Sequence, residues 1–167
     1  VRNLIFFLVL LSSQLYAGTV YLTPQEALKR AFQGSAEVVS EKKGLAPEQK
    51  KRIEKALGGK VAKDQWIFYL GKSGAKVDGY ALIDHEIGKT EPITFLTALD
   101  PKGVVKGVEI LVYREPIGGE VKSENFRRQF VGKKEADPIR IGQDIKNITG
   151  ATLSSRAVSV GVKRAVL

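Results

Sequence analysis

Cysteine is absent from the 167-residue chain, and histidine occurs once, at His85. Without thiolates the chain has no cysteine ligands for an iron–sulfur cluster, no attachment point for a c-type haem and no disulfide. A zinc site made of the usual cysteine and histidine ligands is excluded for the same reason. Any redox chemistry of this protein must therefore use a cofactor that needs neither residue.

The lone histidine lies in the polar stretch Ile83-Asp84-His85-Glu86. A histidyl–flavin bond or a proton relay is one interpretation of such a residue, and an ordinary position in a surface turn is the simpler one. We therefore expect His85 to be a surface turn residue.

Positive charge is not concentrated in any one segment, although the net charge is +9, from 27 Lys and Arg against 18 Asp and Glu. Pairs such as Lys42-Lys43 and Lys133-Lys134 are spread along the chain, and no basic helix is interleaved with aromatic residues. Nucleic-acid binding is therefore not expected. The charge favours an ordinary solvated surface, and attraction to an acidic partner or an anionic membrane face is the alternative.

The apolar run Leu4–Leu11 is too short to span a membrane comfortably. Eight residues of helix reach about 12 Å, whereas a bilayer core is about 30 Å thick. With Arg2 before it and Ala17 after it, the run is typical of a signal peptide. We expect residues 1–17 to be a signal peptide cleaved after Ala17, and the mature protein to be periplasmic or otherwise extracytoplasmic. The alternative is retention of the run as an N-terminal anchor, which would keep the protein at the membrane.

Two helices are expected in residues 18–63. The segment Thr23-Pro24-Gln25-Glu26 has a capping residue, a proline suited to the first turn and a glutamate that completes a capping box. A second helix is expected from Pro47 to the glycines at 58 and 59. We therefore expect an N-terminal helical segment over residues 18–63.

The pattern then changes to strands, with four expected at 65–70, 77–83, 93–99 and 104–113. The last two flank Asp100-Pro101-Lys102-Gly103, whose residues all favour a turn, so they form a predicted hairpin. After the hairpin we expect a helix from Ser123 to about Phe130, with Val131 as a further apolar anchor, then a short strand at 139–141. A last helix is expected from Ser154 or Ser155 to Val166. The expected fold is α+β, a mostly antiparallel twisted sheet bracketed by helices.

The stretch from Asp144 to Ser155 is the most informative part of the sequence. Gly150 and Ala151 leave room for a ligand to approach the backbone, and hydroxyl residues gather where the last helix begins. The free N–H groups and the dipole of a helix N-terminus attract phosphate. The alternative from residue types alone is a well-capped helix, because Ser and Thr are favoured caps.

The run Thr149-Gly150-Ala151-Thr152-Leu153-Ser154-Ser155, with Asp144 upstream, resembles the flavinylation motif of the FMN-binding domain family. That family includes one subunit of the sodium-translocating NADH:quinone reductases and one subunit of the Rnf complexes. The resemblance implies that Thr152 bears FMN through a phosphothreonyl ester, made outside the cytoplasm by a separate FMN transferase. Such a protein is a phosphoprotein and a flavoprotein, and the bond needs no Cys or His.

The resemblance extends over roughly residues 77–167. Gly79-Tyr80-Ala81, the predicted hairpin and Arg114–Glu120 are similar to successive family segments. One departure is Ile117-Gly118-Gly119, where many members have Pro-Gly, an apolar residue and Gly. The resemblance implies a single FMN-binding domain over 64–167. The cofactor-binding residues that it implies are Thr152, Gly150, Ala151, Leu153, Ser154, Ser155, Thr149, Asp144, Glu115, Ile117 and Gly118.

Some residues have a structural interpretation beside a functional one. Glu115 is expected either to contact the flavin or to form an ion pair with Arg114 or Arg127. Lys163 is expected either to bind phosphate or to lie at the surface. Four aromatic residues that alternate as in a strand are expected in the core rather than stacked on a flavin; these are Trp66, Phe68, Tyr69 and Tyr80.

No nucleophile, acid–base pair or substrate site is evident, so an electron-transfer carrier is expected rather than a complete enzyme. Its implied partners are the FMN transferase and redox proteins, and the membrane is one location for the latter. The alternative function is a non-redox cell-envelope binding module that retains the fold.

Overall fold

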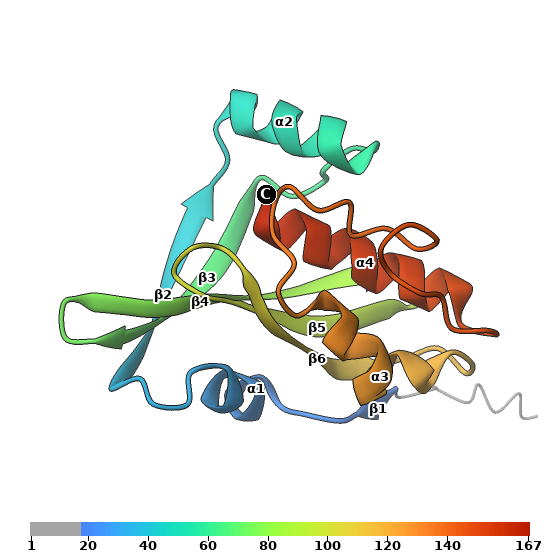
Figure 1. The fold of residues 1–167 in the computed structure, drawn as a ribbon, viewed down its shortest axis with the longest axis horizontal. Helices are drawn as coiled ribbons and strands as arrows, with labels where there is room; N and C mark the ends of the chain where they lie inside the picture. The colour runs from blue at the N-terminus through green and yellow to red at the C-terminus, as the bar shows by residue number, and fades with distance from the viewer. Residues whose placement is uncertain (1–17) are drawn as a thin grey trace, which may run out of the picture.

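Six strands form one antiparallel sheet in the computed structural model, which describes residues 18–167. The expected signal peptide, residues 1–17, lies outside the described residues. The strand order across the sheet is β1-β6-β5-β4-β3-β2 (Figure 1). The bounds are β1 Thr19–Val20, β2 Glu37–Gly44, β3 Gln65–Ser73, β4 Lys76–Ile87, β5 Pro92–Leu99 and β6 Val105–Tyr113.

The β5–β6 hairpin forms as predicted because its turn residues use their side chains. The Asp100 carboxylate accepts the backbone N–H of Lys102 at 2.8 Å and of Val104 at 2.9 Å. Gly103 adopts a φ of +78°, which residues with a Cβ rarely adopt. The register pairs Phe95 with Ile110, so both side chains lie on one face of the sheet.

The predicted helices also form. Helix α1, Pro24–Ala31, begins with the expected capping box between Thr23 and Glu26, and α2 spans Pro47–Leu57. The expected helix after Ser123 divides into α3, Glu124–Arg127, and a 3₁₀ turn, η2, Arg128–Phe130, preceded by another 3₁₀ turn, η1, Gly119–Lys122. The last helix, α4, spans Thr152–Val166.

The helices cover both faces of the sheet (Figure 1). On one face, α4 inserts Val158 and Val162 against Phe95 and Ile110, with Phe126 and Phe130 beside them. On the same face, α2 packs Ile53 against Trp66 and Leu82. On the other face, Ala27 and Phe32 of α1 lie against Ala81, Leu96 and Leu111. The alternation of side chains along β4 and β5 thus supplies two cores, and the expected α+β class is confirmed.

Four expectations were wrong in detail. The predicted strand at 139–141 does not form, because Ile139 has a φ of +49° and Ile141 makes only an isolated bridge with Ile145. Val131 is 53% exposed rather than an inward anchor. Helix α4 begins at Thr152, not at Ser154 or Ser155. His85 is exposed as expected, but it lies within β4 rather than in a turn.

The segment 18–63 contains two strands that the sequence did not indicate. β1 pairs with β6, and β2 pairs with β3 over its full length from Glu37 to Gly44. The N-terminal segment therefore supplies both edges of the sheet that carries α4. Within residues 18–167, no helix has the length and apolarity needed to cross a bilayer.

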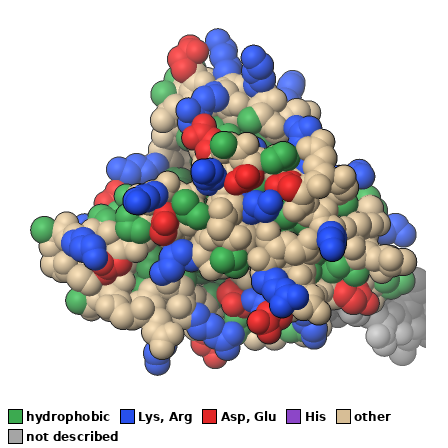
Figure 2. Space-filling view, viewed as in Figure 1, with side chains coloured by type: hydrophobic (Ala, Val, Ile, Leu, Met, Phe, Trp, Pro, Cys, Tyr) green, Lys and Arg blue, Asp and Glu red, His purple; other side chains and the backbone are tan. Residues whose placement is uncertain are grey.

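Lysine and arginine side chains are scattered over the face drawn in Figure 2, with acidic side chains among them. Ten ion pairs join the two kinds of charge in the described part of the chain, including Arg127 with Glu109 at 2.7 Å and Lys133 with Asp144 at 2.9 Å. The expected mixed, solvated surface is what the face in Figure 2 presents.

Candidate functional site

The N-terminus of α4 has no side-chain cap. Its N-cap residue is Ala151, which cannot accept a hydrogen bond through its side chain. The hydroxyls nearby do not substitute for it, since Ser154 contacts Tyr113 and the Thr152 hydroxyl contacts Asn147. The interpretation of this stretch as a well-capped helix is therefore wrong, and the first-turn N–H groups are available to an anion.

Thr152 is exposed at this uncapped end. Its Oγ1 accepts a hydrogen bond of 2.8 Å from Nδ2 of Asn147. Gly150 has a φ of +84° and open space where a Cβ would lie, so the turn leaves the hydroxyl approachable. A hydroxyl in this position can be esterified without moving the core.

A pocket of about 310 Å³ lies beside Thr152. It brings together two segments that are distant in sequence, the turn after β6 and the start of α4. Seven of the eleven predicted cofactor-binding residues line it, namely Glu115, Ile117, Gly150, Ala151, Thr152, Leu153 and Ser154, together with Lys89 and Pro116. Ile117 and Leu153 are 74% and 46% exposed, so the wall has apolar side chains that water now covers.

Glu115 is buried, with 4% of its surface exposed, and its carboxylate holds the loop between β4 and β5. Oε1 accepts the backbone N–H groups of Lys89, Thr90 and Glu91, and Oε2 accepts the Thr90 hydroxyl at 3.2 Å. Burial alone would raise the pKa of Glu115, but these hydrogen bonds hold the pKa below its ordinary value. The carboxylate is therefore ionised at neutral pH.

The two ion pairs expected as alternatives for Glu115 do not form. Arg114 donates to the carbonyl of Pro92 and the hydroxyl of Thr94. Arg127 pairs with Glu109 at 2.7 Å. Glu115 instead satisfies backbone donors, while its side chain also lines the pocket.

Gly118 lies directly over the start of α4. A Cβ on it would be 2.5 Å from the Tyr113 hydroxyl and 2.8 Å from Ser154 Oγ, and its φ is +97°. The Tyr113 hydroxyl donates to the carbonyl of Ile117 at 2.6 Å. Glycine at 118 thus allows the turn after β6 to touch both Tyr113 and α4.

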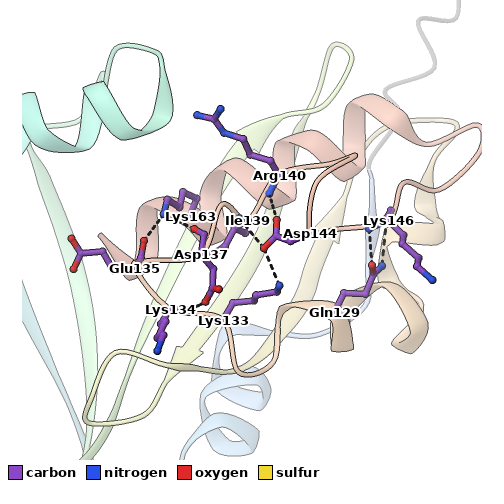
Figure 3. Close-up of polar contacts among 10 residues, drawn as sticks. All are labelled: Gln129, Lys133, Lys134, Glu135, Asp137, Ile139, Arg140, Asp144, Lys146 and Lys163. Carbon is purple, nitrogen blue, oxygen red and sulfur yellow. Dashed lines mark hydrogen bonds and ion pairs between the residues drawn. The ribbon is translucent and has the colours of Figure 1, made fainter.

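Asp144 does not line the pocket, although it was expected to bind the cofactor. Its carboxylate accepts the backbone N–H of Ile139 at 3.2 Å and of Arg140 at 2.9 Å, and it pairs with Lys133 at 2.9 Å (Figure 3). These contacts fix the loop that carries Ile139 in its unusual backbone conformation and leads to Thr149. In the described structure, Asp144 shapes the approach to Thr152 from outside the pocket.

Thr149, Ser155 and Gly118 also lie outside the pocket lining. Thr149 is exposed in the turn. Ser155 is fully buried, and its Oγ has no hydrogen-bond partner in the described residues. An unpaired buried hydroxyl costs stability, and we find no compensating contact for this one.

Lys163 neither binds the pocket nor lies free at the surface. Its Nζ donates to the carbonyls of Glu135 at 2.6 Å and Asp137 at 2.7 Å, which ties α4 to the loop before Ile139 (Figure 3). The aromatic residues Trp66, Phe68, Tyr69 and Tyr80 contribute to the packing of β3 and β4, and none lines the pocket at Thr152.

Three residues of the site were missed by sequence reasoning. Lys89 lies in a loop with no recognisable motif, Asn147 is one polar residue among several, and Tyr113 was placed only as the end of a strand. Their importance depends on contacts between distant segments. Among residues 18–167, no group of three or more His, Asp or Glu side chains has the arrangement of a metal site.

Comparison with known proteins agrees with this geometry. Residues 88–167 match the model of a family described as FMN-binding domain. The chain is 34% identical over 112 residues to a subunit of the proton-translocating ferredoxin:NAD(+) oxidoreductase complex of Clostridium ljungdahlii, covering 62% of this chain and 59% of that protein. It is 27% identical over 125 residues to the subunit of the same letter in the Na(+)-translocating complex of Acetobacterium woodii, covering 69% and 60%. The chain therefore spans about three fifths of the length of these relatives.

Two solved structures share the fold. Shewanella oneidensis NqrC has a TM-score of 0.56 at 17% identity, with 81% of this chain and 80% of that one covered. A subunit of the Na(+)-translocating NADH-quinone reductase of Parabacteroides distasonis has a TM-score of 0.50 at 16% identity, with 87% and 85% covered. At these identities the likeness concerns the fold.

Proposed function

Residues 88–167 belong to the FMN-binding domain family, and from this membership we propose that the protein carries FMN through a phosphoester to Thr152 and transfers electrons outside the cytoplasm. The observation that carries the proposal is the exposed Thr152 hydroxyl at an uncapped helix N-terminus, beside a pocket of about 310 Å³. The ester would consist of a bond between Thr152 Oγ1 and the phosphorus of FMN.

The residues present suit this cofactor. The first-turn N–H groups of α4 are free to face the phosphate, and Asn147 already donates to the acceptor oxygen. The exposed side chains of Ile117 and Leu153 offer apolar contacts for a flat ring. The flavin supplies the redox chemistry when bound, whereas the protein holds it, limits its motion and sets its electrostatic surroundings.

Three further parts of the proposal concern the context of the protein. A separate FMN transferase forms the bond, as in the motif that the sequence resembles. Export depends on residues 1–17, and retention of that segment would keep the protein at the membrane. Since the relatives are subunits of ion-translocating oxidoreductase complexes, we expect redox partner proteins at or in a membrane. We also propose residues 64–167 as the FMN-binding domain.

A non-redox binding module with the same fold is the competing function. Such a module has no use for an approachable hydroxyl at an uncapped helix end, so a cap in place of Ala151 and a filled pocket would be expected instead. The geometry around Thr152 favours the flavoprotein.

The test is expression with an FMN transferase in a host that exports the protein. Thr152→Ala should abolish the fluorescent band in a denaturing gel and the FMN mass increment. Loss of the hydroxyl at this exposed position costs about 1 kcal/mol or less, so the variant should stay folded. Thr152→Ser should still be modified, since the oxygen remains, and Thr149→Ala should keep the acceptor. Retention of covalent flavin by Thr152→Ala would assign the attachment elsewhere.

A further inference from the structure

The loop Gly88–Glu91, which joins β4 to β5, is clamped from one side by the Glu115 carboxylate. Three consecutive N–H groups, of Lys89, Thr90 and Glu91, converge on the same oxygen. A Cβ at position 88 would be 2.9 Å from that oxygen, so glycine is needed for the approach. The backbone of Lys89 is therefore fixed relative to the turn that follows β6.

Lys89 lines the pocket on the wall that faces the start of α4. Within residues 18–167 it is the one cationic side chain of the pocket lining, and no ion pair involving it is found there. The acidic residue of the same lining, Glu115, is already engaged with backbone donors. The pocket thus holds a lysine whose charge the protein leaves unmatched.

We propose that Lys89 is the positive charge that meets the negative charge of the bound cofactor, and that Glu115 is the residue that positions it. The proposal rests on the proposed function and extends it to electrostatic tuning. The phosphodiester is an anion, and the flavin gains negative charge when it takes up more electrons than protons. A nearby ammonium lowers the free energy of both, and so favours the reduced cofactor.

The two residues are separable because they predict shifts of opposite sign if each acts only through its own charge. Loss of a cation should disfavour reduction, and loss of an anion should favour it. If Glu115 acts by holding Lys89 in place, its removal should disfavour reduction although an anion has been lost. A residue that merely stabilises the fold would move neither potential.

The experiment is a spectroelectrochemical titration of the purified protein with its flavin attached. Lys89→Gln keeps the backbone donor to Glu115 and removes the charge. We expect it to lower the reduced-to-oxidised ratio at a fixed potential by about tenfold, the effect of one unit charge roughly 12 Å away at an effective dielectric of about 20. Lys89→Arg should restore the wild-type ratio. Lys102→Gln, in the turn at the far end of β5, makes the same charge change and should have no effect.

The role of Glu115 is tested by Glu115→Ala, which removes all acceptors, and Glu115→Gln, which keeps them. The alanine variant should lower the ratio and expose the amides of 89–91 to hydrogen exchange, and the glutamine variant should do neither. In a Lys89→Gln background, Glu115→Ala should cause no further fall, because there is no charge left to misplace.

The outcomes separate this inference from the proposed function. Normal loading with flavin and an unchanged ratio in Lys89→Gln would overturn the assignment to Lys89. A rise in the ratio in Glu115→Ala would overturn positioning in favour of direct charge. If Lys89→Gln failed to load but Lys89→Arg loaded, a required positive charge at 89 would be supported. Absence of covalent flavin from the wild-type protein would overturn the proposed function itself.

Discussion

The hydroxyl of Tyr113, at the end of β6, lies 2.8 Å from the hydroxyl of Ser154 in the first turn of α4. Because the Tyr113 hydrogen is donated to the carbonyl of Ile117, Ser154 must donate to the tyrosine oxygen. Burial raises the pKa of Tyr113, so the phenol stays protonated and can donate. This chain of two bonds joins the sheet, the turn over the pocket and the helix that carries Thr152.

Tyr113→Phe should break both bonds while preserving the ring. It leaves the buried Ser154 hydroxyl and the Ile117 carbonyl short of a partner, which costs about 1–3 kcal/mol. Urea unfolding measures the loss. Tyr80→Phe is the matched control, because the Tyr80 hydroxyl has no hydrogen bond in the described residues and should lose little. Equal stabilities for the two variants would show that the Tyr113 network contributes nothing.

Gly118→Ala should destabilise the protein and impair flavin attachment. The left-handed backbone costs a residue with a Cβ about 1–2 kcal/mol, and the contact with Tyr113 and Ser154 adds about 1–3 kcal/mol of overpacking. Gly74→Ala shares a positive φ of +63° but meets no atom within 4 Å, so it should show the backbone cost alone. The difference between the two unfolding free energies isolates the close contact.

Asp84 should make the protein sensitive to acid. Its buried carboxylate lies 2.6 Å from Lys63 Nζ and 2.5 Å from Arg164 Nη2. Burial opposes ionisation, yet Arg164 and Lys63 hold the pKa of Asp84 below its ordinary value. Since the pKa in the unfolded chain is about 3.9, the pairing contributes stability above about pH 4 and loses it as the pH falls through the folded pKa.

Asp84→Asn should therefore cost about 3 kcal/mol at pH 7, because it leaves two cations facing a neutral side chain, and should flatten the decline of stability below pH 4. Asp64→Asn breaks the exposed pair with Lys50 and should cost under about 1 kcal/mol. Unfolding measured between pH 3 and pH 7 gives both slopes. Parallel pH profiles for wild type and Asp84→Asn would contradict the linkage.

Asp144→Asn should loosen the loop of Figure 3 without altering the cofactor's potential. The amide cannot accept the three donors that the carboxylate accepts, so we expect a loss of about 1–3 kcal/mol. Hydrogen exchange at the amides of Ile139 and Arg140 should accelerate. Because Asp144 does not line the pocket, a shift in the potential of the loaded variant, rather than its loading or stability, would contradict this placement.

Much of the fold could be predicted because local signals agreed with the final structure. The capping box at Thr23 and the turn at Asp100 act through neighbours three or four residues away, so the sequence contains the whole interaction. β2 shows the opposite case. The run Glu37–Gly44 has four charged residues and no clear alternation, and it becomes a strand because β3 offers a free edge.

The same division applies to the site. Thr152 and its turn could be identified from contiguous residues, since a hydroxyl, two small residues and a helix start occur together. Asp144 belongs to the same motif, yet its carboxylate faces the loop of Ile139, and only the backbone path decides that. Lys89 could not be found at all, because Glu115 brings it to the pocket from a distance of 26 residues.

Trp66, the only tryptophan of the chain, lies beside Arg164 near the end of α4 that is opposite Thr152. Twelve residues of helix separate positions 152 and 164, or roughly 18 Å. Flavins absorb light at the wavelengths at which indole emits, so the two ends of α4 would form a donor and an acceptor for energy transfer. A protein loaded with FMN would thus contain its own optical ruler, in which the emission lifetime of Trp66 reports whether the cofactor is attached and how closely it is held.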